Sequence, residues 1–141
     1  MKVSTILATK GANVVTIAPE TAVSEAVRLF NKHDIGALVV VSDDQLMGIL
    51  SERDIVRQLA HYERMLDVPV QDLMTPRVIV GRPQDDLASI VHTMTEKRFR
   101  HLPIVENGRL IGIISIGDVL KAQRDQYRGE ISTLEAQMIG E

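Results

Sequence analysis

The 141-residue sequence contains no cysteine and no tryptophan, and it has only two phenylalanines and two tyrosines. Without cysteine the chain has no disulfide, no thiolate metal ligand and no cysteine nucleophile. Four aromatic rings leave little surface for stacking single-stranded bases, and a net charge of −3 offers no basic face for duplex nucleic acid. We therefore expect no nucleic-acid partner.

Long apolar runs are missing as well. None approaches the roughly 20 residues that a helix needs to cross a bilayer, and residues 1–4 lack the apolar core of a signal peptide. We expect a soluble, cytoplasmic protein with no membrane partner. With 45% hydrophobic residues, the chain is globular and suits one compact domain made of two halves.

The sequence does contain an internal repeat. Glycine, two apolar residues, serine, two variable residues and aspartate occur in this order at residues 48–54 and again at residues 112–118. Residues 15–57 align with residues 79–121 without a gap. A duplicated α/β unit accounts for this alignment. Because one unit of this size is marginally stable alone, we expect the two units to share a core.

Each copy predicts the same order of elements: strand, helix, strand, turn, strand, helix. Apolar residues at helical spacing follow Pro19 and Pro83, with N-caps expected at Thr21 and Asp85. Pairs of short apolar runs separated by turn residues then predict hairpins. These runs are residues 37–41 and 46–50 in the first copy, and residues 102–105 and 110–114 in the second.

Segments outside the repeat predict further helices. Apolar residues of matching spacing at 3–7 and 70–74 predict a short helix before the first strand of each half. Near the C-terminus, a narrow apolar stripe predicts a helix that packs on this chain, on a symmetry mate or on another protein. Its members are Tyr127, Ile131, Leu134 and Met138. We divide the chain into residues 1–66, 67–124 and a tail at 125–141.

The repeated motif has two interpretations. Ser51 and Ser115 follow a strand and open a helix, where free N–H groups attract phosphate, and the motif glycine permits close backbone approach. Asp54 and Asp118 lie one turn later and can accept hydrogen bonds from a ribose diol. The same spacing is also close to a capping box, which only stabilises the helix. Recurrence at one register favours binding.

These features resemble a tandem pair of CBS domains, the module named after cystathionine β-synthase. The resemblance rests on Pro19, Pro83, residues 72–75, residues 100–105 and both motifs, and it covers nearly the whole chain. It implies an α/β (α+β) fold of two β-α-β-β-α repeats packed about a pseudo-twofold axis. Two clefts between the repeats would bind adenosine-containing ligands, among them AMP, ADP, ATP, S-adenosylmethionine or NAD(H). It also implies a homodimer.

The family's roles carry over onto particular residues. Asp54 and Asp118 would hold ribose hydroxyls, and Ser51 and Ser115 would lie beside phosphate or ribose. The residues expected near adenine are Thr16, Ile17, Ile49, Val80, Gly81 and Ile113. The remaining nucleotide-binding candidates are Arg53, Arg57, Arg100, His101, Pro103 and Lys121. Because the second copy has Arg100-His101 where the first has Gly36-Ala37, we expect two inequivalent sites.

No residue set predicts catalysis or a metal site. Ser51 and Asp54 lack an orienting histidine nearby in the sequence, and the histidines show no metal-ligand spacing. The leading hypothesis is therefore a non-catalytic sensor that binds an adenine nucleotide, needs no catalytic cofactor and reports to an unidentified protein partner or through its own oligomer. The alternative is a scaffold whose motifs are helix caps only and whose tail helix is the functional surface.

Overall fold

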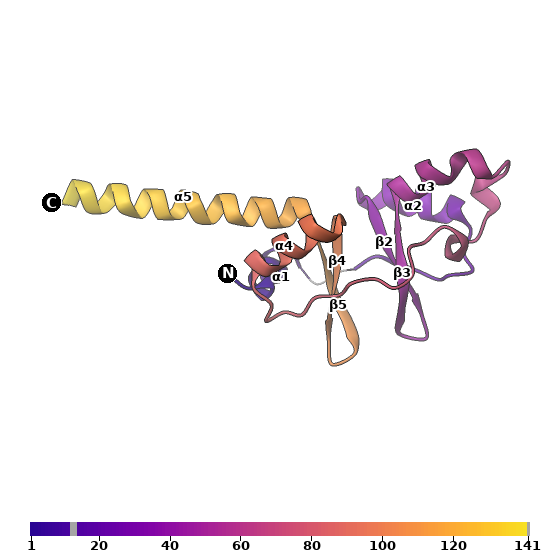
Figure 1. Cartoon of the computed structure of the whole chain (residues 1–141), viewed down its shortest axis with the longest axis horizontal. Helices are drawn as coiled ribbons and strands as arrows, with labels where there is room; N and C mark the ends of the chain where they lie inside the picture. The colour runs from indigo at the N-terminus through magenta and orange to yellow at the C-terminus, as the bar shows by residue number, and fades with distance from the viewer. Residues whose placement is uncertain (12–13, 141) are drawn as a thin grey trace.

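Two α/β halves lie side by side in the computed structural model, which describes residues 1–11 and 14–140, and a long helix projects from the second half (Figure 1). The first half contains β1 (Thr16–Ile17), α2 (Val23–His33), β2 (Ala37–Ser42), β3 (Gln45–Ser51) and α3 (Glu52–Gln58). The second contains α4 (Leu87–Lys97), β4 (His101–Glu106), β5 (Arg109–Ser115) and α5 (Ile116–Gly140). Helix α1 (Val3–Lys10) opens the chain, and the halves are connected by three 3₁₀ turns, η1 (Leu59–His61), η2 (Met65–Asp67) and η3 (Val70–Asp72).

The two hairpins confirm the duplication in detail. Ala37 pairs with Ser51 in the β2–β3 hairpin, and His101 pairs with Ser115 at the same place in the β4–β5 hairpin. Each hairpin has a bulge, between Val40 and Val41 in the first and between Ile104 and Val105 in the second. The shared register follows from the apolar pattern, since a slip of one residue would turn the buried side chains outward.

The first strand of the second half is shorter than predicted. In the first half, β1 pairs in parallel with β2, whereas in the second half a single bridge joins Gly81 to Ile104. Val80 is 45% exposed, and Arg77 adopts a left-handed φ of 56°. The chain thus turns just before this segment and reaches β4 only at Gly81, where a Cβ atom would lie 2.7 Å from the Leu102 side chain.

The N-caps of α2 and α4 fall one residue later than predicted. They are Ala22 and Asp86, and neither caps its helix through its side chain. Backbone carbonyls from the lead-in segments take this role, because Val23 N–H donates to the Val68 carbonyl at 2.8 Å and Leu87 N–H donates to the Met1 carbonyl at 3.0 Å. With the first helical N–H satisfied in this way, a side-chain cap is not required.

The core consists of two clusters rather than the single shared core predicted. Val3 and Ile6 of α1 pack with Leu87, Ile90 and Met94 of the second half. Val70 and Leu73 pack with the first half. Within residues 70–74 only a 3₁₀ turn forms, at Val70–Asp72, in place of the predicted helix, whereas the helix predicted at 3–7 is confirmed as α1. The segment that precedes the first half thus packs on the second half, and the segment that precedes the second half packs on the first.

Helix α5 combines the last helix of the second repeat with the tail. It runs without a break from Ile116 to Gly140, and its first turns pack on the body through the buried Val119. The tail leaves the body and extends away from it (Figure 1). Of the helices in the described part of the chain, none combines the length and the apolar character of a membrane span.

Candidate functional site

Both Ser-x-x-Asp motifs form reciprocal capping boxes. Asp54 N–H donates to Ser51 Oγ at 3.1 Å, and Ser51 N–H donates to Asp54 Oδ2 at 2.9 Å. The second motif repeats this geometry at 3.1 Å and 2.8 Å between Ser115 and Asp118. All four residues are half-buried. The capping interpretation is therefore correct as a description of the local structure. The remaining question is whether the carboxylates can also bind a ligand.

Each cap uses only one oxygen of its carboxylate. The Oδ2 atoms of Asp54 and Asp118 accept the serine N–H groups. Their Oδ1 atoms make no hydrogen bond with the described part of the chain. Because a carboxylate has about four lone-pair positions, a cap of this kind leaves acceptor capacity for a ligand. Capping and binding are thus compatible in one residue.

The motif glycines pack against the lead-in segments. A Cβ atom on Gly48 would lie 2.6 Å from the Thr75 carbonyl oxygen, and one on Gly112 would lie 2.6 Å from Leu7 Cδ2. At the first contact, Ile49 and Thr75 also exchange backbone hydrogen bonds of 3.0 and 2.8 Å. The close approach predicted at these glycines therefore occurs, but it is made by the chain itself.

A lysine of the N-terminal helix α1 forms hydrogen bonds with the second motif. Lys10 Nζ donates to Asp118 Oδ2 at 2.7 Å and to the Ile113 carbonyl oxygen at 2.8 Å. Both acceptors belong to residues that the sequence predicted to bind nucleotide. In the first motif, no cation of the described residues bonds Asp54 in this way. The two motifs, alike in their caps, thus differ in their electrostatics.

Burial, hydrogen bonds and nearby charges shift two pKa values at the second motif. Burial raises the pKa of Asp118, but hydrogen bonds from Lys10 and Ser115 outweigh it, so the net pKa lies below its ordinary value. Burial lowers the pKa of His101, and nearby Lys10 and Arg100 lower it further against the opposing effects of Asp118 and Asp54. The lowered pKa favours the neutral imidazole of His101 at neutral pH.

The starts of β2 and β4 adjoin the motif helices. Glu52 N–H donates to the Gly36 carbonyl at 3.0 Å, and Ile116 N–H donates to the Arg100 carbonyl at 2.8 Å. The predicted difference between the copies at this position therefore lies at the helix N-terminus of each motif. Strands β3 and β5, which lead into the two motifs, also contact each other.

The other predicted site residues divide by exposure. Ile17 is 6% exposed within the first core cluster, and Ile49 is 8% exposed. Pro103 and Gly81 are buried and linked by a 2.9 Å backbone hydrogen bond. The exposed residues of the predicted set are Thr16, Arg53, Arg57, Val80, Arg100 and Lys121. The buried members shape the strands, so only the exposed and half-buried ones are free to touch a ligand.

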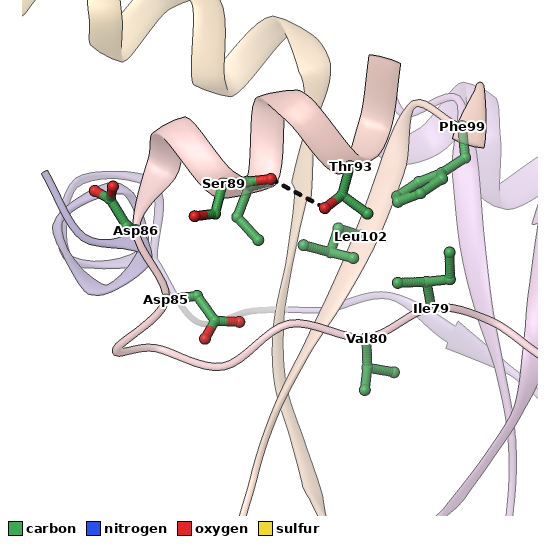
Figure 2. A pocket seen from close by; sticks show the side chains of 9 residues that line it. Ile79, Val80, Asp85, Asp86, Ser89, Thr93, Phe99 and Leu102 are labelled. Atoms are coloured by element: carbon green, nitrogen blue, oxygen red, sulfur yellow. Dashed lines mark hydrogen bonds between the residues drawn. The ribbon is translucent and has the colours of Figure 1, made fainter. Parts of the chain in front are cut away.

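A groove of about 470 Å³ lies between α1 and the first turns of α5. It includes Lys10, Asp118 and Lys121 in its lining, and its volume falls in the range of small-molecule sites. A smaller pocket of about 280 Å³ lies between α4 and the segment before Gly81 (Figure 2). Among the predicted residues it contains only Val80. The larger groove is therefore the one that reaches a predicted motif.

Lys10 is the functional candidate that sequence reasoning missed. It lies far from both motifs in the sequence, and nothing in their spacing points to it. One signal was available, because the match between residues 3–7 and 70–74 places Lys10 opposite Arg77, a second basic residue. That signal does not reveal the contact, since Arg77 itself is exposed.

Comparisons with known proteins agree with the repeat. The family model described as "CBS domain" matches residues 3–61 and 70–125. The "CBS domain-containing protein YhcV" of Bacillus subtilis is 32% identical over 116 residues, which are 82% of this chain and 83% of that protein. The structure of the CBS-domain-containing protein ATU1752 from Agrobacterium tumefaciens is 41% identical, with a TM-score of 0.84 and coverage of 87% and 99%.

The similar structures include complexes with AMP. The crystal structure of CBSX2 in complex with AMP is 27% identical to this chain, with a TM-score of 0.69. The match covers 80% of this chain and 90% of CBSX2.

Proposed function

Because the chain belongs to the CBS domain family, we propose that it is a non-catalytic regulatory module that binds an adenosine-containing ligand at the Asp54 and Asp118 motifs. The candidate ligands are AMP, ADP, ATP and NAD(H). The AMP complex of CBSX2 supports an adenine nucleotide as the ligand class. We include in the proposal a homodimer and an unidentified protein partner to which the ligand state is reported.

The observation that carries the proposal is the pair of contacts made by Lys10. One ammonium group donates both to the Asp118 carboxylate and to the Ile113 carbonyl. The second motif thus presents hydrogen-bond acceptors in a half-buried position, and it needs a donor to satisfy them. A nucleoside supplies such donors through its ribose hydroxyls and its amino group. Lys10 supplies donors to Asp118 Oδ2 and to the Ile113 carbonyl, so a ligand that bonds either of these two atoms displaces it.

Displacement changes what Lys10 can do. Once released from Asp118, its ammonium is free to pair with phosphate, as a cation on a flexible stem. Arg100 lies beside the same motif and can bind phosphate through two parallel hydrogen bonds. The second site therefore favours phosphorylated ligands. The first site has Gly36 and Ala37 at the equivalent position, so it depends more on ribose and adenine contacts.

The serines lack what nucleophilic catalysis requires. A serine nucleophile needs an adjacent general base to remove its proton. Ser51 Oγ and Ser115 Oγ accept hydrogen bonds from backbone N–H groups. The motif carboxylates accept hydrogen bonds from the serine N–H groups and not from the serine hydroxyls. This arrangement supports binding and helix capping rather than acyl or phosphoryl transfer.

The capping boxes also favour a second candidate, a scaffold in which the motifs serve stability alone. Both candidates share the geometry between serine and aspartate, and they differ in whether a ligand occupies the remaining carboxylate oxygen. The scaffold predicts that loss of the acids changes only the free energy of unfolding. The sensor predicts that ligand affinity changes as well.

The test begins with ligands released from the denatured protein, identified by mass spectrometry, followed by calorimetric titration with AMP, ATP and NADH. A ligand that binds only the native state raises the free energy of unfolding by RT ln(1 + [L]/Kd), and the melting temperature rises with it. The double variant Asp54→Asn/Asp118→Asn keeps an acceptor for each cap while removing both charges. We expect it to fold and to lose binding. Absence of binding to all three ligands by the parent protein would contradict the proposal.

A further inference from the structure

The projecting part of α5 carries an exposed apolar stripe, here called the tail stripe, of Tyr127, Ile131, Leu134 and Met138. Their side chains are 62%, 55%, 60% and 76% exposed. This part of the helix extends away from both halves (Figure 1). Four large apolar groups on one face of a free helix are unusual for a surface that remains in water. The tail stripe therefore requires a partner.

The spacing of the tail stripe is that of a coiled-coil seam. Successive intervals of four, three and four residues are those between alternating d and a positions of a heptad. Tyr127 and Leu134 take d positions, and Ile131 and Met138 take a positions. Leu120 lies one heptad before Tyr127 and is 55% exposed. A second helix is the partner that fits this seam.

The charges beside the seam distinguish two orientations of that helix. Arg128 and Glu135 each follow a d residue and take e positions, and Glu130 directly precedes Ile131 and takes a g position. If two copies of α5 pair in parallel, Glu130 meets Glu135 of the second copy, and the symmetry repeats this repulsion. If they pair antiparallel, Arg128 meets Glu135 of the second copy twice. The helix is thus complementary to an antiparallel copy of itself.

The length of the free helix fits the antiparallel arrangement. Asp125 and Gln126 are the last residues of α5 that line the groove with α1. With Ile131 opposite Leu134 of the second copy, Tyr127 lies opposite Met138 of the second copy. The paired segment therefore begins where α5 leaves the body. Each helix covers the whole tail stripe of the other, and the two bodies lie at opposite ends.

We propose that the tail stripe pairs antiparallel with the tail stripe of a second copy of this chain. The inference specifies a contact of the homodimer included in the proposed function, and it does not depend on nucleotide binding. Apolar burial supplies the attraction, and the pairs between Arg128 and Glu135 select the orientation.

The first test compares Ile131→Asp with the control Ser132→Asp by sedimentation equilibrium of the full chain. Both variants add one charge to the same turn, but only Ile131 lies in the tail stripe. We expect the parent and the control to be dimers at micromolar concentration and Ile131→Asp to be a monomer with unchanged nucleotide affinity. A parent that is monomeric, or an Ile131→Asp variant that still dimerises, overturns the inference. If Ile131→Asp still dimerises, the homodimer forms through another surface, and the proposed function is unaffected.

The second test determines orientation through charge reversal. Glu135→Arg converts two attractions into two repulsions in the antiparallel pair, so the association constant falls about tenfold. Arg128→Glu acts alike, and the double variant Arg128→Glu/Glu135→Arg restores association to within about twofold of the parent. A parallel pair gives the opposite result for Glu135→Arg, because it removes the repulsion with Glu130. Tighter association of Glu135→Arg would therefore overturn the antiparallel arrangement.

Discussion

Lys10 Nζ lies 2.7 Å from Asp118 Oδ2, although 108 positions of sequence separate the two residues. The contact joins the end of α1 to the first turn of α5, so a charge from the N-terminal helix neutralises the acid of the second motif. Side-chain exposures of 38% and 27% place the pair in an intermediate environment, less screened than a surface ion pair. A ligand that bonds Asp118 Oδ2 or the Ile113 carbonyl competes with this lysine.

Removal of the competing lysine should strengthen nucleoside binding. We expect Lys10→Met to raise the affinity of the second site for adenosine about fivefold, because an ion pair of this exposure contributes about 1 kcal/mol that adenosine must otherwise displace. AMP should gain less, since it loses the released ammonium as a phosphate partner. Calorimetric titration with both ligands measures the difference.

Lys2→Met is the matched control, because it removes one exposed positive charge beside the same helix without touching Asp118. It should leave both affinities unchanged. Weaker adenosine binding by Lys10→Met would mean that Lys10 contacts the nucleoside rather than competes with it.

The first motif allows binding to be separated from capping. We expect Asp54→Ala to weaken nucleotide binding by about 1.5 to 3 kcal/mol, the contribution of hydrogen bonds to a charged group, and to lower the free energy of unfolding by about 1 kcal/mol through the lost cap. Asp54→Asn should retain most of the stability while losing affinity. Calorimetry and urea denaturation of the same variants measure the two effects.

Glu52→Ala serves as the control, since it removes an exposed acid from the first turn of the same helix. It should change stability by a few tenths of a kcal/mol through the helix dipole and leave affinity unchanged. If Asp54→Ala loses stability but binds all ligands as the parent does, the first motif is a cap alone.

The features that were predicted correctly from the sequence are those that local residue patterns determine. Strand order, hairpin turns and motif position follow from apolar spacing and from turn residues such as Asn107-Gly108, and the two copies supported each other. The register of His101 opposite Ser115 follows in the same way, because the buried face of a strand fixes its pairing. These features depend on neighbours in the sequence.

Features that depend on distant segments were missed. Val3 completes the core of the second half, and the Met1 carbonyl accepts the Leu87 N–H, so the expected side-chain cap is unnecessary. Gly112 is packed against Leu7, which no motif pattern reveals. Lys10 at Asp118 is of the same kind. Each contact brings the N-terminal segment onto the second half, and a repeat within the sequence does not encode which lead-in packs on which half.

Acid should destabilise the protein through His101. Its pKa in the folded state lies below the ordinary value near 6.5, chiefly because it is buried, so the unfolded chain binds more protons below that pH. The corresponding stability is fully present above about pH 6.5 and is lost as pH falls toward the folded-state pKa. We expect His101→Gln to flatten the dependence of unfolding free energy on pH in this window, measured by urea denaturation.

His61→Gln is the control, because His61 is exposed, and it should retain the pH dependence of the parent. Asp118 affects the unfolding free energy in a separate, more acidic pH range. A carboxylate with a lowered pKa loses its stabilising effect only as pH drops below its ordinary value near 3.8. The two effects are therefore separable. An unaltered profile for His101→Gln would show that another group controls this window.

Arg100 should distinguish phosphorylated ligands from nucleosides. Its side chain is exposed, and its backbone carbonyl accepts a hydrogen bond from Ile116 N–H, the first of α5. Substitution therefore removes the side chain without disturbing that backbone contact. We expect Arg100→Ala to weaken AMP binding at the second site by about 2 kcal/mol, since charge-assisted hydrogen bonds are about twice as strong as neutral ones, and to change adenosine binding little. Lys97→Ala, which removes an exposed charge at the end of α4, should affect neither ligand. Equal losses for AMP and adenosine, or no loss for either, would mean that the phosphate end of the site lies elsewhere. In that case Lys10 and Lys121 are the remaining cations that line the groove at Asp118, and combining Lys10→Met with Arg100→Ala would determine whether Lys10 binds the phosphate.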